Sequence, residues 1–375
     1  MTVAGGGGVR VAGPWAVACL GILVADLVAR PVVEVPPPGE LRLVDAMGLH
    51  VGGCAASTAS GLARLGVRAG VLGKVGRDAL GDFLLGALRR DGVDTSAVIV
   101  DPTVSTSSTM ALVGPSGERA FLHCFGGNGA LRGEEVALEA SGPARILHVA
   151  GTGLLPALDG AGLAGLCARA RRLGMTVTLD TAWDPLGGWE RVLPLLPHVD
   201  YFLPSQAEAR YIFGVAEPEA VAHAARAHGA RAVVVKLGAR GCYVAPGPGE
   251  GGQHLPALPG PVLDTTGAGD AFCAGFLAGL LHGRDAVGAA RLGTAAACQA
   301  VACLGAVSGI GSWAQTLAVL ERGGLGAAPA AGGRGPAGDG ARDPATRGAR
   351  APERDAGGHA EPVAGQDTGR DTGRD

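Results

Sequence analysis

Aromatic side chains and lysine are both scarce in this sequence. Aromatic residues make up 4% of its 375 residues, and Lys74 and Lys236 are the only two lysines. With so few rings, a folded core has to be packed by valine, leucine, alanine and close backbone contacts. The formal net charge of -3 provides no basic field, which argues against a nucleic-acid or anionic-membrane partner.

Metal-binding cysteine motifs and long apolar runs are missing as well. The eight cysteines contain no C-x-x-C pair, so we expect reduced, mostly buried thiols. The apolar run at 15–29 is too short to span a membrane and is interrupted by Asp26. It could be the core of a signal peptide, but no clean cleavage pattern follows, and we favour a buried strand. The sequence therefore predicts a cytoplasmic protein.

Low-complexity segments lie at both ends of the chain. Residues 1–10 are rich in glycine, and residues 324–375 are rich in Gly, Ala, Pro, Arg and Asp. Such segments bury too little apolar surface to offset the entropy lost on ordering. We expect a flexible N-terminus at 1–10, one domain at 11–323 and a disordered tail at 324–375.

Between these ends, short apolar runs alternate with helical patterns. This alternation predicts a doubly wound α/β domain, with a mainly parallel sheet and helices on both faces. The expected strands are 17–25, 144–151, 175–180, 199–205 and 231–238, and the expected helices are 56–66, 81–92, 161–174 and 218–229.

Two segments, 31–51 and 105–125, break the alternation. They contain the turn signals PPPGE and GPSGE between strand-like runs, which predicts a small sheet that covers the active site as a lid. Ligands of open parallel sheets bind beyond the carboxyl ends of the strands. The residues expected at that edge are Asp26, Asp180, Ser205 and Gly238, with Thr265 if 262–264 is a short strand.

The stretch DTTGAGDAF at 264–272 indicates a turn and then a helix that begins near Ala268. Gly267 and Gly269 lack the Cβ atoms that would keep an anion from the backbone. The free amides of residues 268–270 would point outward at the positive end of the helix and could cradle a phosphate. Asp270 is then either a carboxylate that complements the helix dipole or a base that accepts a proton from an attacking hydroxyl. The helix terminus should lower its pKa.

The string DTTGAGDAFCAGF resembles the C-terminal signature of the PfkB, or ribokinase-like, carbohydrate kinases. GGCAASTASGLARLG (52–66) with GKVGRDALGDFLLGALRRDGVDTS (73–96) is similar to the N-terminal signature of the family, and VVVKLGARGCYV (233–244) lies between the two. The resemblance covers about residues 15–322. It implies a ribokinase-like fold with a β lid, and the ATP- and Mg²⁺-dependent phosphorylation of a hydroxyl on a sugar or similar compound.

The resemblance also implies roles for individual residues. Asp270 matches the catalytic base, and Gly267, Ala268 and Gly269 match the anion hole. Asp26, expected at the end of the first strand, matches a carboxylate that holds substrate hydroxyls; otherwise it would be a solvated turn residue. The other implied substrate positions are Gly52, Gly53 and Ser57, the last where the family often has asparagine.

The implied nucleotide site departs from the family pattern at two places. The N-x-x-E element occurs here as Ser205 to Glu208, and Glu208 would hold Mg²⁺ through water. The frequent T-L-G-x-x-G loop reads KLGARG, with Gly238 and Gly241 kept and Lys236 in place of threonine. Lys236 either adds positive charge near the phosphates or is simply solvated.

The resemblance further implies a possible monovalent cation, K⁺. Asp264 and Thr266 match family positions that coordinate it, with carbonyls near Ala300, Cys303 and Gly305 completing the site. An Asp-Thr pair is otherwise an ordinary turn. Family members commonly pair their lids, so a homodimer through the lid is also possible.

Two other functions stay open. A nucleoside (adenosine-like) kinase would need an aromatic platform for the base, for which only Phe121, Phe125 and Trp183 are candidates. A non-catalytic sugar-binding relative would be expected to lack Asp270, which is present. Substrate specificity would depend on the lid and on residues around Asp26, Ser57 and Asn128.

Overall fold

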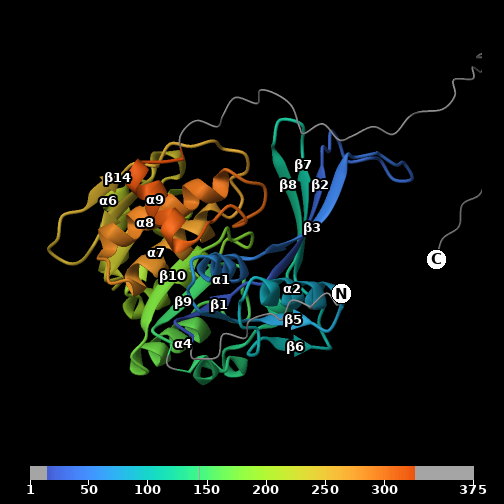
Figure 1. Cartoon of the computed structure of the whole chain (residues 1–375). Helices are drawn as coiled ribbons and strands as arrows, with labels where there is room; N and C mark the ends of the chain where they lie inside the picture. The colour runs from blue at the N-terminus through green and yellow to red at the C-terminus, as the bar shows by residue number, and fades with distance from the viewer. Residues whose placement is uncertain (1–14, 143, 326–375) are drawn as a thin grey trace, which may run out of the picture. The chain divides into compact units, whose positions relative to one another are not determined.

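The computed structural model describes residues 15–142 and 144–325. Its central sheet has eight strands in the order β14-β13-β12-β11-β10-β9-β1-β4 (Figure 1). The strands from β4 to β12 are parallel, and the last two at the other edge are antiparallel. The strands are β1 (Val17–Gly21), β4 (Ala69–Leu72), β9 (Ile146–Thr152), β10 (Thr176–Thr181), β11 (Tyr201–Phe202), β12 (Ala232–Lys236), β13 (Cys242–Ala245) and β14 (Gln253–Leu255).

Helices cover both faces of this sheet. In β1, Ala18 and Leu20 pack into one apolar core and Val17 and Cys19 into the other, as expected for a strand buried on both sides. The first core contains side chains of α4 (Ala161–Arg172), α5 (Gln206–Phe213) and α6 (Pro218–Ala227). The second contains side chains of α1 (Cys54–Arg64), α2 (Ala79–Arg90), α7 (Ala268–Leu281) and α8 (Ala286–Val301). The doubly wound fold is therefore confirmed.

The remaining helices are short or peripheral. They are α3 (Gly126–Ala130), α9 (Trp313–Arg322), which contacts α8, and the 3-10 segments Gly133–Glu135, Leu138–Ser141, Trp189–His198 and Gly238–Arg240. Within residues 15–142 and 144–325, no helix is both long enough and apolar enough to cross a bilayer.

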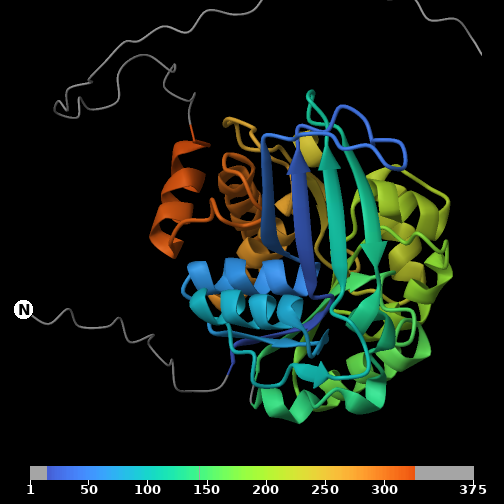
Figure 2. The same cartoon turned by 90° about the vertical axis from the view of Figure 1, so that its right-hand side faces the viewer.

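A four-stranded sheet, the lid, stands out from the body of the molecule in Figure 1 and is seen face-on in Figure 2. Its strand order is β3-β2-β7-β8, and its register places Asp26 of β2 opposite His50 of β3 and beside Thr109 of β7. The strands are β2 (Val24–Arg30), β3 (Ala46–Gly52), β7 (Ser108–Val113) and β8 (Arg119–Cys124); β5 (Lys74–Gly76) and β6 (Ile99–Asp101) form a separate parallel pair.

The first predicted strand is wrong in one respect. The run 17–25 divides into β1, which ends at Gly21, and β2, which belongs to the lid, so Asp26 lies within a lid strand and not at the end of a core strand. A Cβ on Gly21 would lie 1.8 Å from the carbonyl oxygen of Ala150, so the chain can pass β9 closely only at a glycine. Asn128 then fixes Leu23 through two hydrogen bonds of 3.1 Å to its backbone.

Other expected segments agree in part. The strands expected within 105–125 are present as β7 and β8, but in the region 31–51 the one strand is β3 (Ala46–Gly52). Residues 262–264 form no strand, so Thr265 does not follow one. The predicted flexible segment 1–10 lies outside the described residues, as does all of the predicted tail except Gly324 and Leu325. The amide of Leu325 donates to the Pro259 carbonyl at 3.0 Å.

Candidate active site

The glycine-rich turn leads into α7 as the sequence predicts. Gly267 is the N-cap with φ of 69°, and a Cβ there would lie 2.5 Å from the carbonyl oxygen of Ala306, so only glycine suits this contact. The amide of Ala268 donates to the Thr265 carbonyl at 3.3 Å, so it is not available as predicted. The amides of Gly269 and Asp270 remain at the open end of the helix.

Asp270 has a carboxyl whose pKa is raised to about 7. Burial is the largest cause and the nearby Asp180 carboxylate adds to it, while Lys236 and a hydrogen bond from the Cys54 thiol act in the opposite direction. The prediction that the helix terminus lowers this pKa is therefore wrong, because desolvation outweighs the helix dipole. Asp270 keeps some exposed surface, and a pKa near neutrality suits a group that accepts a proton.

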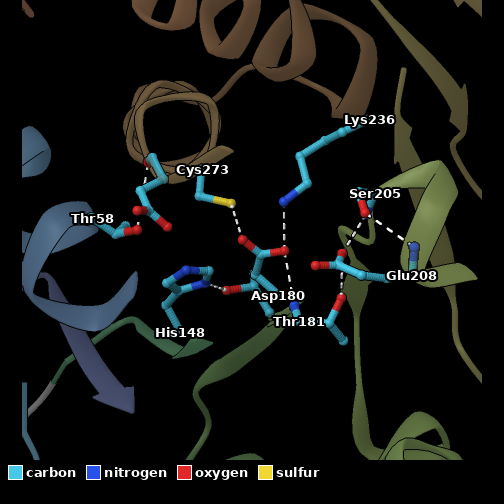
Figure 3. A network of polar contacts seen from close by, with 10 residues as sticks. Thr58, His148, Asp180, Thr181, Ser205, Glu208, Lys236 and Cys273 are labelled. Atoms are coloured by element: carbon cyan, nitrogen blue, oxygen red, sulfur yellow. Dashed lines mark hydrogen bonds and ion pairs between the residues drawn. The ribbon is translucent and has the colours of Figure 1, made fainter. Parts of the chain in front are cut away.

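Lys236 and Asp180 form an ion pair (Figure 3), and both affect the pKa of Asp270. Lys236 Nζ lies 2.6 Å from Asp180 Oδ1, and the two side chains are only 14% and 2% exposed. Burial acts to lower the pKa of Lys236, but Asp180, with smaller contributions from Cys273 and Glu208, outweighs it and the pKa is raised. The solvated interpretation of Lys236 is thus wrong. A Cβ on Gly269 would lie 3.3 Å from Nζ, so the ammonium group lies beside the first turn of α7.

Two buried polar residues of this network were not assigned by sequence reasoning. Asp180 was expected at the sheet edge but received no role; its Oδ2 accepts from the Cys273 thiol at 3.3 Å. His148 lies beneath it, bonded through Nδ1 to Thr178 Oγ1 at 2.8 Å. Burial lowers the pKa of His148 to about 4, so it is neutral. Each of the two could have been noticed in the sequence, because Asp180 and His148 are polar residues within otherwise apolar strand patterns.

Ser205 and Glu208 form a capping box at the start of α5. Ser205 Oγ accepts from the Glu208 amide at 3.2 Å, and Glu208 Oε2 accepts from the Ser205 amide at 2.9 Å. Thr181 Oγ1 also donates to Oε2 at 2.8 Å. The serine in place of asparagine therefore has a local explanation in helix capping.

The same carboxylate is suited to hold a divalent cation. Among the described residues no partner is found for Glu208 Oε1, and Figure 3 shows this carboxylate pointing toward Asp180 and Lys236. Mg²⁺ is commonly held by one or two carboxylates together with phosphates and water, so the residues present fit Mg²⁺.

The loop at 238–241 lies beside α5. Gly241, with φ of 90°, would place a Cβ 2.1 Å from the Leu255 carbonyl oxygen, so it serves a close chain crossing. Arg240 Nη2 donates to Gln206 Oε1 at 2.5 Å, and Ser205 pairs with Lys236 in a parallel bridge. The predicted nucleotide positions are thus brought together.

On the lid, Asp26 faces the glycine pair. A Cβ on Gly52 would lie 2.0 Å from Asp26 Oδ2, so Gly52 gives this carboxylate its space. Gly53, with φ of 89°, lies against the Ile22 carbonyl where β1 passes into β2. Burial raises the pKa of Asp26 to about 6, although a hydrogen bond from Thr109 lowers it. No hydrogen bond or ion pair within the described part of the chain links Asp26 to Asp270.

Other predicted residues are placed elsewhere. Ser57 is 2% exposed on α1 and lines a small cavity with Ser60 and Arg64. Asn128 is fully buried, and its side-chain amide forms two hydrogen bonds with the backbone of Leu23. Trp183, one of the three residues suggested as an aromatic platform, packs against Trp189 and Tyr211.

The positions expected to bind K⁺ are already bonded. Asp264 Oδ1 accepts from the amide and hydroxyl of Thr266, and Oδ2 accepts from the Gly305 amide at 3.1 Å. Arg119 of the lid also donates to Asp264 Oδ1 and to Thr266 Oγ1. The Asp264 side chain therefore does not fit as a free ligand for K⁺.

Known sugar kinases are similar to this chain in sequence, and a solved PfkB protein is similar to it in structure. An uncharacterized sugar kinase of Archaeoglobus fulgidus is 32% identical over 259 residues, covering 67% of this chain and 98% of that protein. A 2-dehydro-3-deoxygluconokinase of Bacillus subtilis is 31% identical over 72% of this chain and 87% of its own length. The PfkB protein of Polaromonas sp. JS666 has a similar structure, with a TM-score of 0.67, 28% identity, and 81% and 99% of the two chains covered.

The family match extends over most of the described fold. Residues 16–312 match the pfkB family carbohydrate kinases, and this range includes the lid, the Asp180 network and the N-terminus of α7. The chain is therefore a carbohydrate kinase and belongs to the pfkB family.

Proposed function

We propose that this kinase transfers the γ-phosphoryl group of ATP to a hydroxyl of a sugar or sugar-like substrate, with Asp270 as the base. The observation that carries the proposal is the start of α7, where a carboxyl with pKa near 7 lies beside open amides and close to the Lys236 ammonium group. A proton acceptor and an anion site are thus adjacent, as phosphoryl transfer requires.

In the proposed reaction, Asp270 accepts the proton as the substrate oxygen forms its bond to the γ-phosphorus. The bond from that phosphorus to the β,γ-bridging oxygen breaks, and ADP leaves. The amides of Gly269 and Asp270, with Lys236, stabilise the negative charge on the transferring group. Gly267, the N-cap with φ of 69°, turns the chain into α7, which begins at Ala268.

The nucleotide would lie along the edge formed by β12 and α5. Gly238 and Gly241 shape the adjacent loop, and Ser205 fixes the start of α5. Mg²⁺ would be held by Glu208 through water, and when bound it would neutralise charge on the phosphates. The complex of a ribokinase II from E. coli with ATP and Mg²⁺ has the same fold, with a TM-score of 0.71.

The substrate would lie between the lid and α7. Asp26 would accept hydrogen bonds from substrate hydroxyls, with Gly52 leaving space for its carboxylate. Relatives are named ribokinase, fructokinase and 2-dehydro-3-deoxygluconokinase, which sets the range of compounds to examine.

ADP release measured over a panel of pentoses, hexoses, deoxy-keto acids and nucleosides tests the proposal. Turnover of a sugar or sugar acid that requires ATP and Mg²⁺ and is lost in Asp270→Asn would support it. Turnover confined to nucleosides would favour the alternative function. Binding of a sugar with no ADP release from the unmodified enzyme would indicate a non-catalytic relative.

We also propose that the lid forms a homodimer. Side-chain alternation places Leu27, Met47, Leu49, Met110 and Leu122 on the lid face opposite to Asp26. Met47 and Leu122 are 60% and 65% exposed, and an apolar face of this kind is typical of an interface between copies.

Mass measurement by light scattering tests the dimer. Leu122→Glu should yield monomers, whereas Leu173→Glu, at a 53% exposed leucine that is the C-cap of α4, should leave the mass unchanged. A monomeric unmodified protein would contradict the proposal. The cytoplasmic location and the domain limits 11–323 stay predictions.

A further inference from the structure

Arg119, the first residue of β8, connects the lid to the turn before α7. Its guanidinium group donates to Asp264 Oδ1 and to Thr266 Oγ1. Alternation along β8 places Arg119 on the same lid face as His123, which pairs with Thr109 beside Asp26. The contact therefore comes from the lid face that carries Asp26.

Asp264 is the centre of this contact. Besides Arg119, its carboxylate accepts the Thr266 amide at 2.9 Å, the Thr266 hydroxyl at 2.6 Å and the Gly305 amide at 3.1 Å. Burial acts to raise its pKa, but the bonds from Thr266, Arg119 and Gly305 outweigh it and lower the pKa to about 2. Asp264 is therefore negatively charged at any working pH, and Arg119 supplies the opposite charge.

The turn that Asp264 organises continues directly into the anion site. Gly267 lies two residues after Thr265 and packs on Ala306, next to Gly305, which Asp264 also holds. A shift of residues 264–266 would therefore move the first turn of α7, with the amides of Gly269 and Asp270. The position of Arg119 thus bears on the geometry of phosphoryl transfer.

We propose that Arg119 is a positioning residue that supplies from the lid the positive charge at the 264–266 turn, in place of a bound monovalent cation. The proposal rests on the kinase function proposed above. A separate K⁺ ion at this carboxylate would lie near the guanidinium group and be repelled by it. Because the charge belongs to the lid, the anion site is held in place only while the lid occupies the position seen here.

Steady-state kinetics in K⁺, in Na⁺ and in tetramethylammonium salts test the proposal. The unmodified enzyme should have the same kcat in all three salts. Arg119→Ala should lower kcat by about 10- to 100-fold, as for a lost charged contact at a positioned site, and added guanidinium or K⁺ should restore part of the loss. The kcat of Arg119→Lys should lie between the kcat of the unmodified enzyme and that of Arg119→Ala.

Arg42→Ala is the matched control. Arg42 belongs to the loop between β2 and β3 and pairs with Glu34 at 2.7 Å on the exposed side of the lid. The Arg42→Ala variant should have the same kcat as the unmodified enzyme in every salt. A strong K⁺ requirement in the unmodified enzyme, or an Arg119→Ala variant with full kcat in tetramethylammonium, would overturn the proposal.

Hydrogen exchange gives a measurement that does not depend on turnover. In Arg119→Ala, but not in Arg42→Ala, peptides covering 259–272 should exchange faster, because the turn has lost its connection to the lid. Unchanged exchange there would refute the connection even if the kinase proposal holds. Faster exchange in a protein that phosphorylates no sugar would keep the connection and refute the kinase proposal instead.

Discussion

The central sheet and the lid sheet differ in what surrounds their strands. Every residue of β1 and β9 is buried, whereas every residue of β8 and most of β3 are exposed. Burial fixes a core strand in place because a shift would expose apolar surface to water. The lid lacks this restraint over most of its length, so its position depends on a few polar contacts and on what packs against it.

The chemical groups divide between the two sheets in the same way. Asp180, Lys236 and Asp270 belong to core elements, and Asp26 and Arg119 belong to lid strands. A movement of the lid would therefore shift Asp26 and Arg119 together and leave the Asp180 network in place. Substitutions in the core should then disable the chemistry, and substitutions beside Asp26 in the lid should mainly alter substrate binding. Arg119 is the exception in the lid, because it acts on kcat through the 264–266 turn.

Asp270→Asn should have the largest effect. Removing the proposed base should lower kcat by about 10²–10⁴-fold, while sugar binding measured by calorimetry should change little. Asp82→Asn is the matched control, since Asp82 is an exposed carboxylate in the first turn of α2. An unchanged kcat in Asp270→Asn would show that the core residue is not the base.

Lys236→Met should affect both stability and pH dependence. It leaves Asp180 as an uncompensated buried charge, which should cost about 3–5 kcal/mol of unfolding free energy. Lys236 also lowers the pKa of Asp270, so its loss should raise that pKa above about 7. Because the base acts when deprotonated, kcat/KM should rise with pH through this pKa, and the rise should move to higher pH in the variant.

The double variant Lys236→Met, Asp180→Asn is the control for this pair. Removing both charges should return much of the stability, because the cost comes from the unpaired carboxylate. Chemical denaturation and pH–rate profiles measure the two effects separately. If the pH–rate profile of Lys236→Met is the same as that of the unmodified enzyme, Lys236 does not affect the pKa of Asp270.

Gly52→Ala tests the lid. The added Cβ would lie 2.0 Å from Asp26 Oδ2 and should displace that carboxylate, at a cost of about 1–3 kcal/mol, which appears mainly as a higher KM for the sugar. Gly165→Ala on α4 is the matched control, because a Cβ there meets nothing within 4 Å. If kcat falls and KM does not, the division of roles between lid and core is wrong.

The same division explains what could be predicted from the sequence. Core strands such as β9 and β10 were predicted within about two residues, because strands buried on both faces give continuous apolar runs. The passage from β1 to β2 was missed, since the run 17–25 stays apolar while the chain leaves one sheet for the other. No local pattern marks that change, which depends on Gly21 meeting Ala150 and on Asn128 holding Leu23.

The candidate site shows a similar limit. The motifs placed Asp270 and Lys236 correctly on α7 and β12, but the direction of the Asp270 pKa depends on burial and on Asp180, which lies 90 residues away in the chain. The contact of Arg119 with Asp264 spans 145 residues. Both are products of the tertiary fold, so a local sequence pattern could not indicate them.

Several buried polar atoms have no hydrogen-bond partner in the described part of the chain, and the pair Asp159 and Asp184 among them gives the smallest predicted effect. Asp159, after β9, accepts two backbone amides through Oδ2, at 3.1 and 3.0 Å from Gly153 and Leu155. Its Oδ1 and Asp184 Oδ2 are buried and have no partner among the described residues. Burial raises the pKa of Asp159 to about 6, with Asp184 adding to the rise and Arg191 opposing it.

Asp159→Asn should therefore stabilise the protein at high pH. A carboxyl whose pKa is higher in the folded state favours folding when protonated, so its contribution is lost as pH rises through about 6. Asparagine stays neutral, keeps an acceptor for the two amides and can donate to Asp184, which should add about 1 kcal/mol above that pH. Thermal denaturation at several pH values measures the gain, which should vanish toward pH 3.8, the ordinary pKa. An equal gain at every pH would mean that the charge of Asp159 is not its cause.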